Sequence, residues 1–288
     1  MATVRCGLRA FFLTYLLVVS APLESKKVIF DFGGVLGETS TFGIMKELNC
    51  LPLFVELTFI DWRLPTDIMG RFFNLLTALF GEQRPVEGST EGSSLYAMGN
   101  GKKLPQVMCD WLRGIYTGPE IAARVCACLD GESVPSTYSS CERKLFKKIA
   151  WTMFNPVVMC KHTHPLAQGI ELLKDCLAAG NDVLLLSNFA PEDFIGIYNK
   201  DEFRDLFTLI PPENIVVSGF IGMIKPEGAI FDYLINAHQL ATADCVFIDD
   251  QEENCEAATS KGITSLRFEK GKVKKIRRTL AEWGVLPA

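Results

Sequence analysis

The feature that most constrains the fold of this chain is a short apolar run that ends in a single carboxylate. The run extends from Val28 to Phe30 and is followed directly by Asp31. After one further residue come Gly33 and Gly34. An apolar run without alternation is typical of a strand buried on both faces of a parallel sheet. The glycine pair allows a tight turn and a close approach of the backbone to a ligand. Because α/β sheets bind ligands at the carboxyl ends of their strands, we interpret Asp31 as a candidate site residue, with a turn-capping role as the alternative.

Three later segments repeat this pattern of apolar residues followed by polar ones. They extend from Val183 to Asn188, from Gly222 to Gly228, and from Cys245 to Asp250. Together with Asp31 they offer a nucleophile, a hydroxyl and an amide for phosphate oxygens, a lysine charge, and an acidic cluster that suits Mg²⁺. The four segments therefore have the side chains that phosphoryl transfer needs.

In their order and spacing, the four segments resemble the four motifs of the haloacid dehalogenase (HAD) superfamily, in its phosphatase-like branch. The resemblance is carried mainly by the strings that begin at Ile224 and Phe247. It implies an α/β fold with a doubly wound parallel sheet, in which residues 26–36 and 164–288 form a HAD-like Rossmannoid core. It also implies an α-helical cap, residues 37–163, inserted after the first strand. The alternation of helices and strands after residue 164 favours the same fold class.

The resemblance also implies a role for each candidate residue. Asp31 would attack phosphorus and form an aspartyl-phosphate. The phosphate would be bound by Ser187, the backbone of Asn188, and Lys225. Mg²⁺ would be held by Asp31, the carbonyl of Gly33 and Asp249, with Asp250 as an additional or water-mediated ligand. We expect Asp249 to matter more than Asp250 for the metal, and Lys225→Met to abolish phosphate binding without loss of the fold.

Gly33 departs from the usual pattern of the superfamily, which has a second aspartate two residues after the nucleophile. That aspartate protonates the leaving group and later activates water. General acid–base help is worth about 10² to 10⁴ in rate, so we expect slow hydrolysis with an intact phosphate site. Some phosphatase-like sequences of the superfamily also carry Asp-x-Gly-Gly-Val, so the change does not by itself abolish function.

Two classes of function fit these observations. The first is a Mg²⁺-dependent hydrolase of a small phosphorylated metabolite, and the second is a catalytically weak binding protein with the same pocket. A haloacid dehalogenase is less favoured, because that chemistry needs no metal whereas Asp249 and Asp250 retain the acidic cluster. The net charge of −5 and the pI of about 5.4 argue against a nucleic-acid partner.

Residues 1–21 have the outline of a secretory signal peptide. Arg5 and Arg9 precede an apolar run from Ala10 to Val19, and small residues follow. This pattern predicts a secreted or periplasmic protein. The alternatives are an uncleaved anchor, which would be the one expected membrane contact, and an additional N-terminal helix in a cytoplasmic protein. The run is short of the roughly 20 residues of a membrane span.

The spacing of apolar residues predicts the secondary structure of the remaining segments. Residues 37–163 show helical spacing without strand-like alternation, so we predict helices only, with a long loop from Gly81 to Pro105. Near the C-terminus, an apolar stripe predicts a final helix that packs on the core: Val273, Ile276, Leu280 and Trp283. Three of the ten cysteines fall within predicted core elements and are expected to be buried: Cys176, Cys245 and Cys255.

Overall fold

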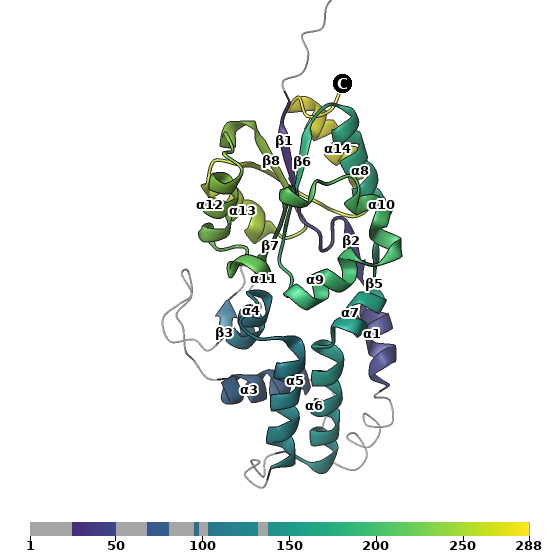
Figure 1. Ribbon diagram of the computed structural model, residues 1–288, viewed down its shortest axis with the longest axis vertical. Coiled ribbons are helices and arrows are strands. Elements are labelled where there is room, and N and C mark those ends of the chain that lie inside the picture. The colour runs from purple at the N-terminus through teal and green to yellow at the C-terminus, as the bar shows by residue number, and fades with distance from the viewer. Residues whose placement is uncertain (1–24, 50–67, 81–94, 98–102, 132–137, 288) are drawn as a thin grey trace, which may run out of the picture.

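The computed structural model describes residues 25–49, 68–80, 95–97, 103–131 and 138–287 (Figure 1). The predicted signal peptide or anchor lies outside these residues. Within the described part of the chain, no helix is both long and apolar enough to span a bilayer. Figure 1 shows a body built around a sheet at one end of the molecule and a group of helices at the other.

A five-stranded parallel sheet forms the centre of the larger body. Its strands lie in the order β7 (Ile215–Val217), β6 (Asp182–Ser187), β1 (Lys27–Phe30), β8 (Cys245–Asp249) and β9 (Thr264–Arg267). β1 is the middle strand, and Phe30 lies opposite Leu185 of β6 and Ile248 of β8. This parallel register brings the carboxyl ends of β1, β6 and β8 to one edge of the sheet, where polar residues follow each strand.

Helices cover both faces of this sheet. Val28 and Phe30 belong to the hydrophobic cluster shared with α8 (Ala167–Ala178) and α14 (Val273–Glu282). Ile29 points the other way, into the cluster shared with α12 (Gly228–Ala237) and α13 (Glu252–Ser260). This alternation follows from strand geometry, and full burial of each side chain is worth about 1.5–3 kcal/mol. The predicted doubly wound α/β sheet is confirmed.

Short helices lie near the ends of the strands that carry the polar residues. α9 (Pro191–Tyr198) follows β6, and α11 (Ser218–Ile221) follows β7. Between them, η2 (Asp201–Phe203), α10 (Arg204–Phe207) and η3 (Pro212–Asn214) lead back to the sheet, and η4 (Thr242–Asp244) precedes β8. Proline at the first helical position of α9 suits the helix start, because its fixed φ is helical and no amide is lost.

After β1 the chain leaves the sheet and forms a helical insert, which we define as residues 41–162. Its described helices are α1 (Thr41–Leu48), α3 (Ile68–Phe80), α4 (Gln106–Leu112), α5 (Gly118–Asp130), α6 (Ser140–Met153) and α7 (Pro156–His162). All of these helices except α7 contribute to a second hydrophobic cluster, in which Phe72 and Phe146 are fully buried. Thr117 and Glu120 form a capping box at the start of α5, a type of cap worth about 1 kcal/mol.

The prediction that this interval contains only helices is wrong at two places. β2 (Gly37–Thr39) pairs antiparallel with β5 (Thr163–Pro165) where the chain leaves and re-enters the core. β3 (Leu95–Ala97) pairs with β4 (Lys103–Pro105) inside the stretch predicted as a loop. Strands of three residues are too short to show a period of two. The rest of the predicted loop, residues 81–94 and 98–102, lies outside the described residues.

Two smaller predictions are confirmed. The three cysteines expected in the core are buried and free. α14 buries three residues of its predicted apolar stripe: Val273, Ile276 and Leu280.

Candidate active site

Asp31 lies at the carboxyl end of the middle strand, between the ends of its two neighbours. It is 4% exposed, and its backbone amide donates a hydrogen bond to the carbonyl of Ile248 at 2.9 Å. The pKa of Asp31 is raised to about 7, chiefly because burial disfavours the charged form; Lys225 opposes this rise, whereas Asp249 and Asp250 add to it. A carboxyl group with such a pKa at the end of a parallel strand is a candidate nucleophile.

Gly33 and Gly34 have different roles in the turn after Asp31. Gly34 has a φ of 73°, and a Cβ there would lie 2.5 Å from Oδ2 of Asp250, so a glycine lets the loop close against this acid. The φ of Gly33 lies outside the left-handed region. Within 4 Å, a Cβ at Gly33 would meet only Oδ2 of Asp31, at 3.9 Å, among the described atoms. The backbone at position 33 therefore admits a side chain.

Ser187 ends β6 and has a hydroxyl group without a partner. The residue is 1% exposed, and its Oγ has no hydrogen-bond partner among the described residues. Leaving a buried hydroxyl unpaired costs about 1–3 kcal/mol, so a bound ligand would relieve this cost. Because β6 lies directly beside β1, the hydroxyl is placed on the strand next to Asp31.

The side chain of Asn188 holds the backbone of Lys225. Its Nδ2 donates to the carbonyl of Lys225 at 2.8 Å, and its Oδ1 accepts from the amide of Lys225 at 2.9 Å. These two bonds join the end of β6 to a loop 37 residues further along the chain. Asn188 thus positions Lys225, a role that the sequence did not reveal, while contact of its own backbone with phosphate stays a prediction.

Lys225 is buried, at 3% exposure, and all three of its ammonium hydrogens are used. The ammonium donates to the carbonyl of Leu186 at 2.9 Å, to Oδ1 of Asp31 at 2.7 Å and to Oδ2 of Asp249 at 2.7 Å. Burial lowers the pKa of Lys225, but the two carboxylates outweigh this effect and the pKa is raised. Lys225 therefore stays charged and neutralises two buried acids.

We expect Lys225→Met to lower the free energy of unfolding by about 3–5 kcal/mol, because Asp31 and Asp249 would be left buried without their cation. This corrects the sequence-based expectation that the fold tolerates the change, since the structure gives Lys225 a structural role as well. Urea unfolding measures the effect. Lys261→Met is the control, because it removes only the exposed ion pair with Asp232 and should cost less than about 1 kcal/mol. Equal stability of Lys225→Met and the wild type would contradict this role.

Asp249 is the last residue of β8 and Asp250 follows it, and the hydrogen bonding of the two acids differs. Asp249 is fully buried; its Oδ1 accepts from the amide of Gln251 at 2.8 Å, and Nδ2 of Asn254 donates to Oδ1 and Oδ2 at 3.1 and 3.0 Å. With Lys225 as a further donor, the carboxylate of Asp249 is saturated. In contrast, Oδ1 of Asp250 is buried and has no hydrogen-bond partner in the described chain. Burial and the charge of Asp249 raise the pKa of Asp250.

The acidic residues around Asp31 fit a divalent cation. Oxygens of Asp31, Asp249 and Asp250 lie within 4.8 Å of one another. Carboxylates are preferred ligands of Mg²⁺, and Oδ1 of Asp250 lacks any other partner in the described chain. The hydrogen bonding therefore favours Asp250 over Asp249 as the direct ligand, which is the opposite of the order expected from the sequence. The role of the Gly33 carbonyl stays a prediction.

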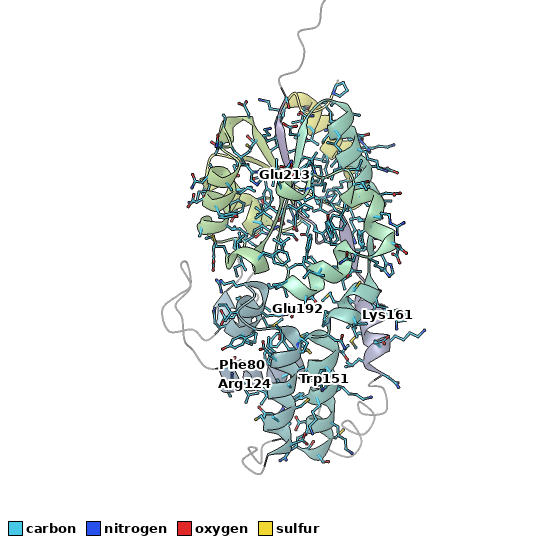
Figure 2. All side chains as sticks on the ribbon, viewed as in Figure 1. Phe80, Arg124, Trp151, Lys161, Glu192 and Glu213 are labelled. Atoms are coloured by element: carbon cyan, nitrogen blue, oxygen red, sulfur yellow. The ribbon has the colours of Figure 1, made fainter. Side chains whose placement is uncertain are left out.

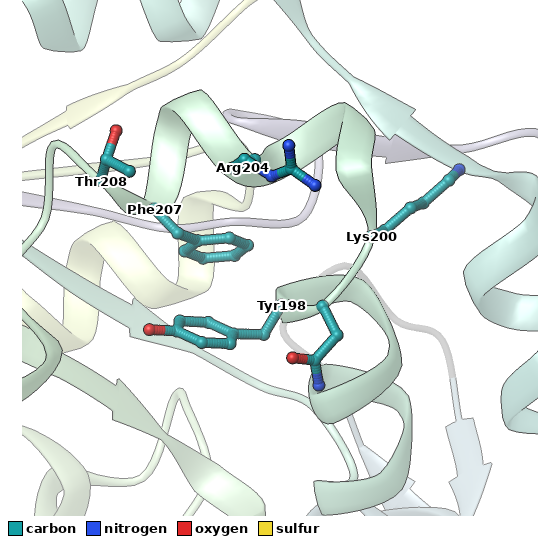
Figure 3. A pocket seen from close by; sticks show the side chains of 6 residues that line it. Tyr198, Lys200, Arg204, Phe207 and Thr208 are labelled. Atoms are coloured by element: carbon teal, nitrogen blue, oxygen red, sulfur yellow. The ribbon is translucent and has the colours of Figure 1, made fainter.

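A surface hollow of about 360 Å³ lies apart from these residues, between α9 and α10 (Figure 3). Six residues line it: Tyr198, Asn199, Lys200, Arg204, Phe207 and Thr208. The ammonium of Lys200 is engaged by the carbonyls of Cys160 and Thr163, at 3.2 and 2.7 Å. Since none of the six belongs to the four predicted segments, we do not assign this hollow to the site.

Solved structures of HAD family enzymes are similar to this chain in fold. One such enzyme from Bacteroides thetaiotaomicron superposes with a TM-score of 0.55 at 16% identity, over 86% of this chain and 95% of that chain. The chain has a HAD-like fold. A magnesium complex of a HAD family enzyme from the same organism gives a TM-score of 0.51 at 18% identity, over 86% of the HAD-like chain and 94% of that chain.

Two curated proteins match part of the HAD-like chain in sequence. A drimenol cyclase of Aspergillus calidoustus is 35% identical over 101 residues, which are 35% of this chain and 18% of that protein. A sesquiterpene phosphatase of Aspergillus oryzae is 28% identical over 104 residues, which are 36% of this chain and 50% of that protein. The chain thus matches half the length of one relative and less than a fifth of the other. No protein-family model matches the chain.

Proposed function

We propose that this chain is a Mg²⁺-dependent phosphatase that hydrolyses phosphate esters of a small metabolite. The observation that carries the proposal is a pair of buried oxygens without hydrogen-bond partners among the described residues: Oγ of Ser187, at the end of β6, and Oδ1 of Asp250, directly after β8. Both strands flank β1. The first suits a phosphate oxygen and the second suits a cation, with Asp31 between them. The sesquiterpene phosphatase and the magnesium complex of the HAD family enzyme support the same chemistry.

Asp31 would carry the covalent step. One of its oxygens attacks phosphorus, so an O–P bond forms while the bond from phosphorus to the ester oxygen breaks. The ester oxygen leaves as an anion and takes a proton from solvent, because Gly33 offers no acid. Water then attacks phosphorus in the aspartyl-phosphate and loses a proton to solvent, while the bond to Asp31 breaks and phosphate leaves. Lys225 fixes Oδ1 of Asp31 and its charge offsets the negative charge of the phosphoryl group, while Ser187 donates its hydroxyl hydrogen to a phosphoryl oxygen.

Mg²⁺ would be held by Asp31, Asp250 and the carbonyl of Gly33, which are three of the four ligands expected from the sequence. When bound, it would neutralise charge on the phosphoryl oxygens. Asp249 would mainly hold neighbouring side chains in place, because its oxygens already accept hydrogen bonds from Lys225 and Asn254. The structure thus supports two different tasks for the neighbouring acids.

We expect Asp250→Asn to weaken Mg²⁺ binding about 100-fold or more, and Asp249→Asn about tenfold through loss of support to the site. The reason is that Oδ1 of Asp250 is buried without a hydrogen-bond partner among the described residues, whereas Asp249 is saturated. Titration calorimetry with MgCl₂ measures both, and Asp232→Asn, at an exposed ion pair, controls for general charge effects. The reverse order of the two variants would restore the assignment expected from the sequence.

The experiment that tests the proposed function is phosphate release from a panel of esters, with Mg²⁺ and with EDTA. The panel contains an acyl phosphate, a sugar 1-phosphate, an aryl phosphate and an alkyl phosphate. Because one relative is a sesquiterpene phosphatase, a sesquiterpenyl phosphate is added. Release that requires Mg²⁺ supports a phosphatase, and no release from any ester would overturn the proposal.

A catalytically weak binding protein is the second candidate, and Gly33 is the observation that favours it. Position 33 has no proton donor, although the backbone there admits a side chain. Such a protein would bind inorganic phosphate in the presence of Mg²⁺ but release none from the panel. A haloacid dehalogenase would instead release chloride from a haloacid without a metal.

The same proposal gives the helical insert the role of a cap that selects the substrate. The division into a core of residues 26–36 and 164–288 and a cap of residues 37–163 is part of this proposal. Its support is that α4 and the turn after it contact loops at the carboxyl edge of the sheet. For example, the hydroxyl of Ser218 donates to the carbonyl of Leu112 at 2.7 Å.

A further inference from the structure

The helical insert contacts the loop of Lys225 through α4 and through Arg113, the residue that follows this helix. Arg113 follows α4 directly and pairs with Glu227, which lies two residues after Lys225. Its guanidinium also lies 3.4 Å from Oδ1 of Asp110. The side chains of Arg113 and Glu227 are each 10% exposed, so this ion pair is largely shielded from water. Removal of one partner of such a shielded ion pair strongly lowers stability, because the other charge is left buried without a counter-charge.

The loop from Ile224 to Glu227 is held from two sides. From the sheet, the side chain of Asn188 binds the amide and the carbonyl of Lys225. From the insert, Cys109 of α4 packs against Ile224 at the start of the loop, and Arg113 binds Glu227 at its end. Lys225 therefore lies in the chain between two residues, Ile224 and Glu227, that the insert contacts.

Several contacts between the described parts of the insert and the core lie away from this loop. The amide of Gly118, at the start of α5, donates to Oε1 of Glu192 at 2.6 Å. Figure 2 shows Glu192 at the junction between the body of the sheet and the insert. The contact between Ser218 and Leu112 is likewise made by α11. A substitution at one of these contacts can therefore test the docking of the insert without changing the loop of Lys225.

We propose that Arg113 is a positioning residue, which acts through Glu227 to hold Lys225 in place between Asp31 and Asp249. The proposal rests on the proposed function, since it concerns the same phosphate site. It makes the placement of the lysine depend on docking of the insert. An insert that moves away would release both of its contacts with the Lys225 loop, and phosphate binding would weaken.

The test uses the full chain and the variants Arg113→Met, Glu227→Met, the double variant and Arg113→Lys, with Glu192→Gln as the matched control. Two quantities are measured. The first is amide hydrogen exchange of residues 222–229 in the free protein. The second is binding of inorganic phosphate in the presence of Mg²⁺, with kcat and KM on a sugar 1-phosphate where turnover is found. Arg113→Lys keeps the charge and serves if the Met variants fail to fold.

We expect each Met variant to speed exchange in the loop and to weaken phosphate binding about tenfold, a typical size for coupling through a packed contact. The double variant should be no weaker than the single ones, because they remove the same pair. Arg113→Lys should shift both quantities in the same direction by less, and Glu192→Gln should change neither by more than about twofold.

Two results would overturn the role of Arg113. One is loop exchange that is unchanged in the Arg113 variants, and the other is an equal effect of Glu192→Gln, which would point to general docking of the insert. If wild-type protein binds no phosphate, the proposed function fails, and exchange in the loop still decides whether Arg113 holds Lys225.

Discussion

Asp31→Asn is expected to lower kcat by about 10⁴-fold or more on every phosphate ester that the wild type hydrolyses. The amide of asparagine has nearly the shape of the carboxylate but cannot attack phosphorus to form the covalent intermediate. The pair between Lys225 and Asp249 remains in the variant, so the fold and the phosphate site should persist. Initial rates with Mg²⁺, with binding of inorganic phosphate measured in parallel, test both parts of this expectation.

A matched control for this variant is Asp193→Asn. Asp193 is also a buried acid, 2% exposed, whose pKa is raised to about 7 by burial and by Glu192, but it lies in the first turn of α9. Its amide variant should keep the wild-type rate to within about threefold, because it removes no group from the four segments. Mass spectrometry of the acid-quenched wild type should find phosphate on Asp31. Turnover that survives Asp31→Asn would assign the nucleophile elsewhere.

The strand ends could be predicted from the sequence because each strand is a local pattern. An uninterrupted apolar run followed by a polar residue identifies Asp31, Ser187 and Asp249 without reference to the rest of the chain. The structure confirms the sheet and places these residues at the carboxyl ends of three adjacent strands. Parallel strands share the direction of their carboxyl ends, so polar residues that follow them meet at one edge.

The partners of these residues could not be predicted, because they depend on contacts across long separations in the chain. The hydrogen bonds between Asn188 and Lys225 join residues 37 positions apart, and the ion pair of Arg113 with Glu227 joins residues 114 positions apart. Lys225 can be buried because the ends of three strands each supply a hydrogen-bond acceptor for its ammonium group. Similarly, the different tasks of Asp249 and Asp250 depend on Asn254 and Lys225 rather than on their order in the sequence.

Gly33→Asp is expected to raise kcat/KM on alkyl phosphates by about 10²-fold, with a much smaller gain on sugar 1-phosphates and aryl phosphates. Without a proton donor, the ester oxygen of the wild type departs largely as an anion, so poor leaving groups react slowly. A Cβ at position 33 would lie 3.9 Å from Oδ2 of Asp31 and would face no other described atom within 4 Å. The side chain can therefore be added without left-handed strain, which the sequence alone left open.

Gly33→Asn separates proton donation from simple occupation of the space at position 33, because it has the same size and cannot donate a proton as an acid. It should leave the rate on alkyl phosphates near that of the wild type. Calorimetry with MgCl₂ shows whether the metal site survives in both variants, since a new carboxylate beside Asp31 adds negative charge there. The comparison of leaving groups in the wild type is the decisive part. If the wild type hydrolyses alkyl and aryl phosphates equally well, another residue already donates the proton, Gly33→Asp has nothing to add, and the helical insert becomes the place to search for the donor.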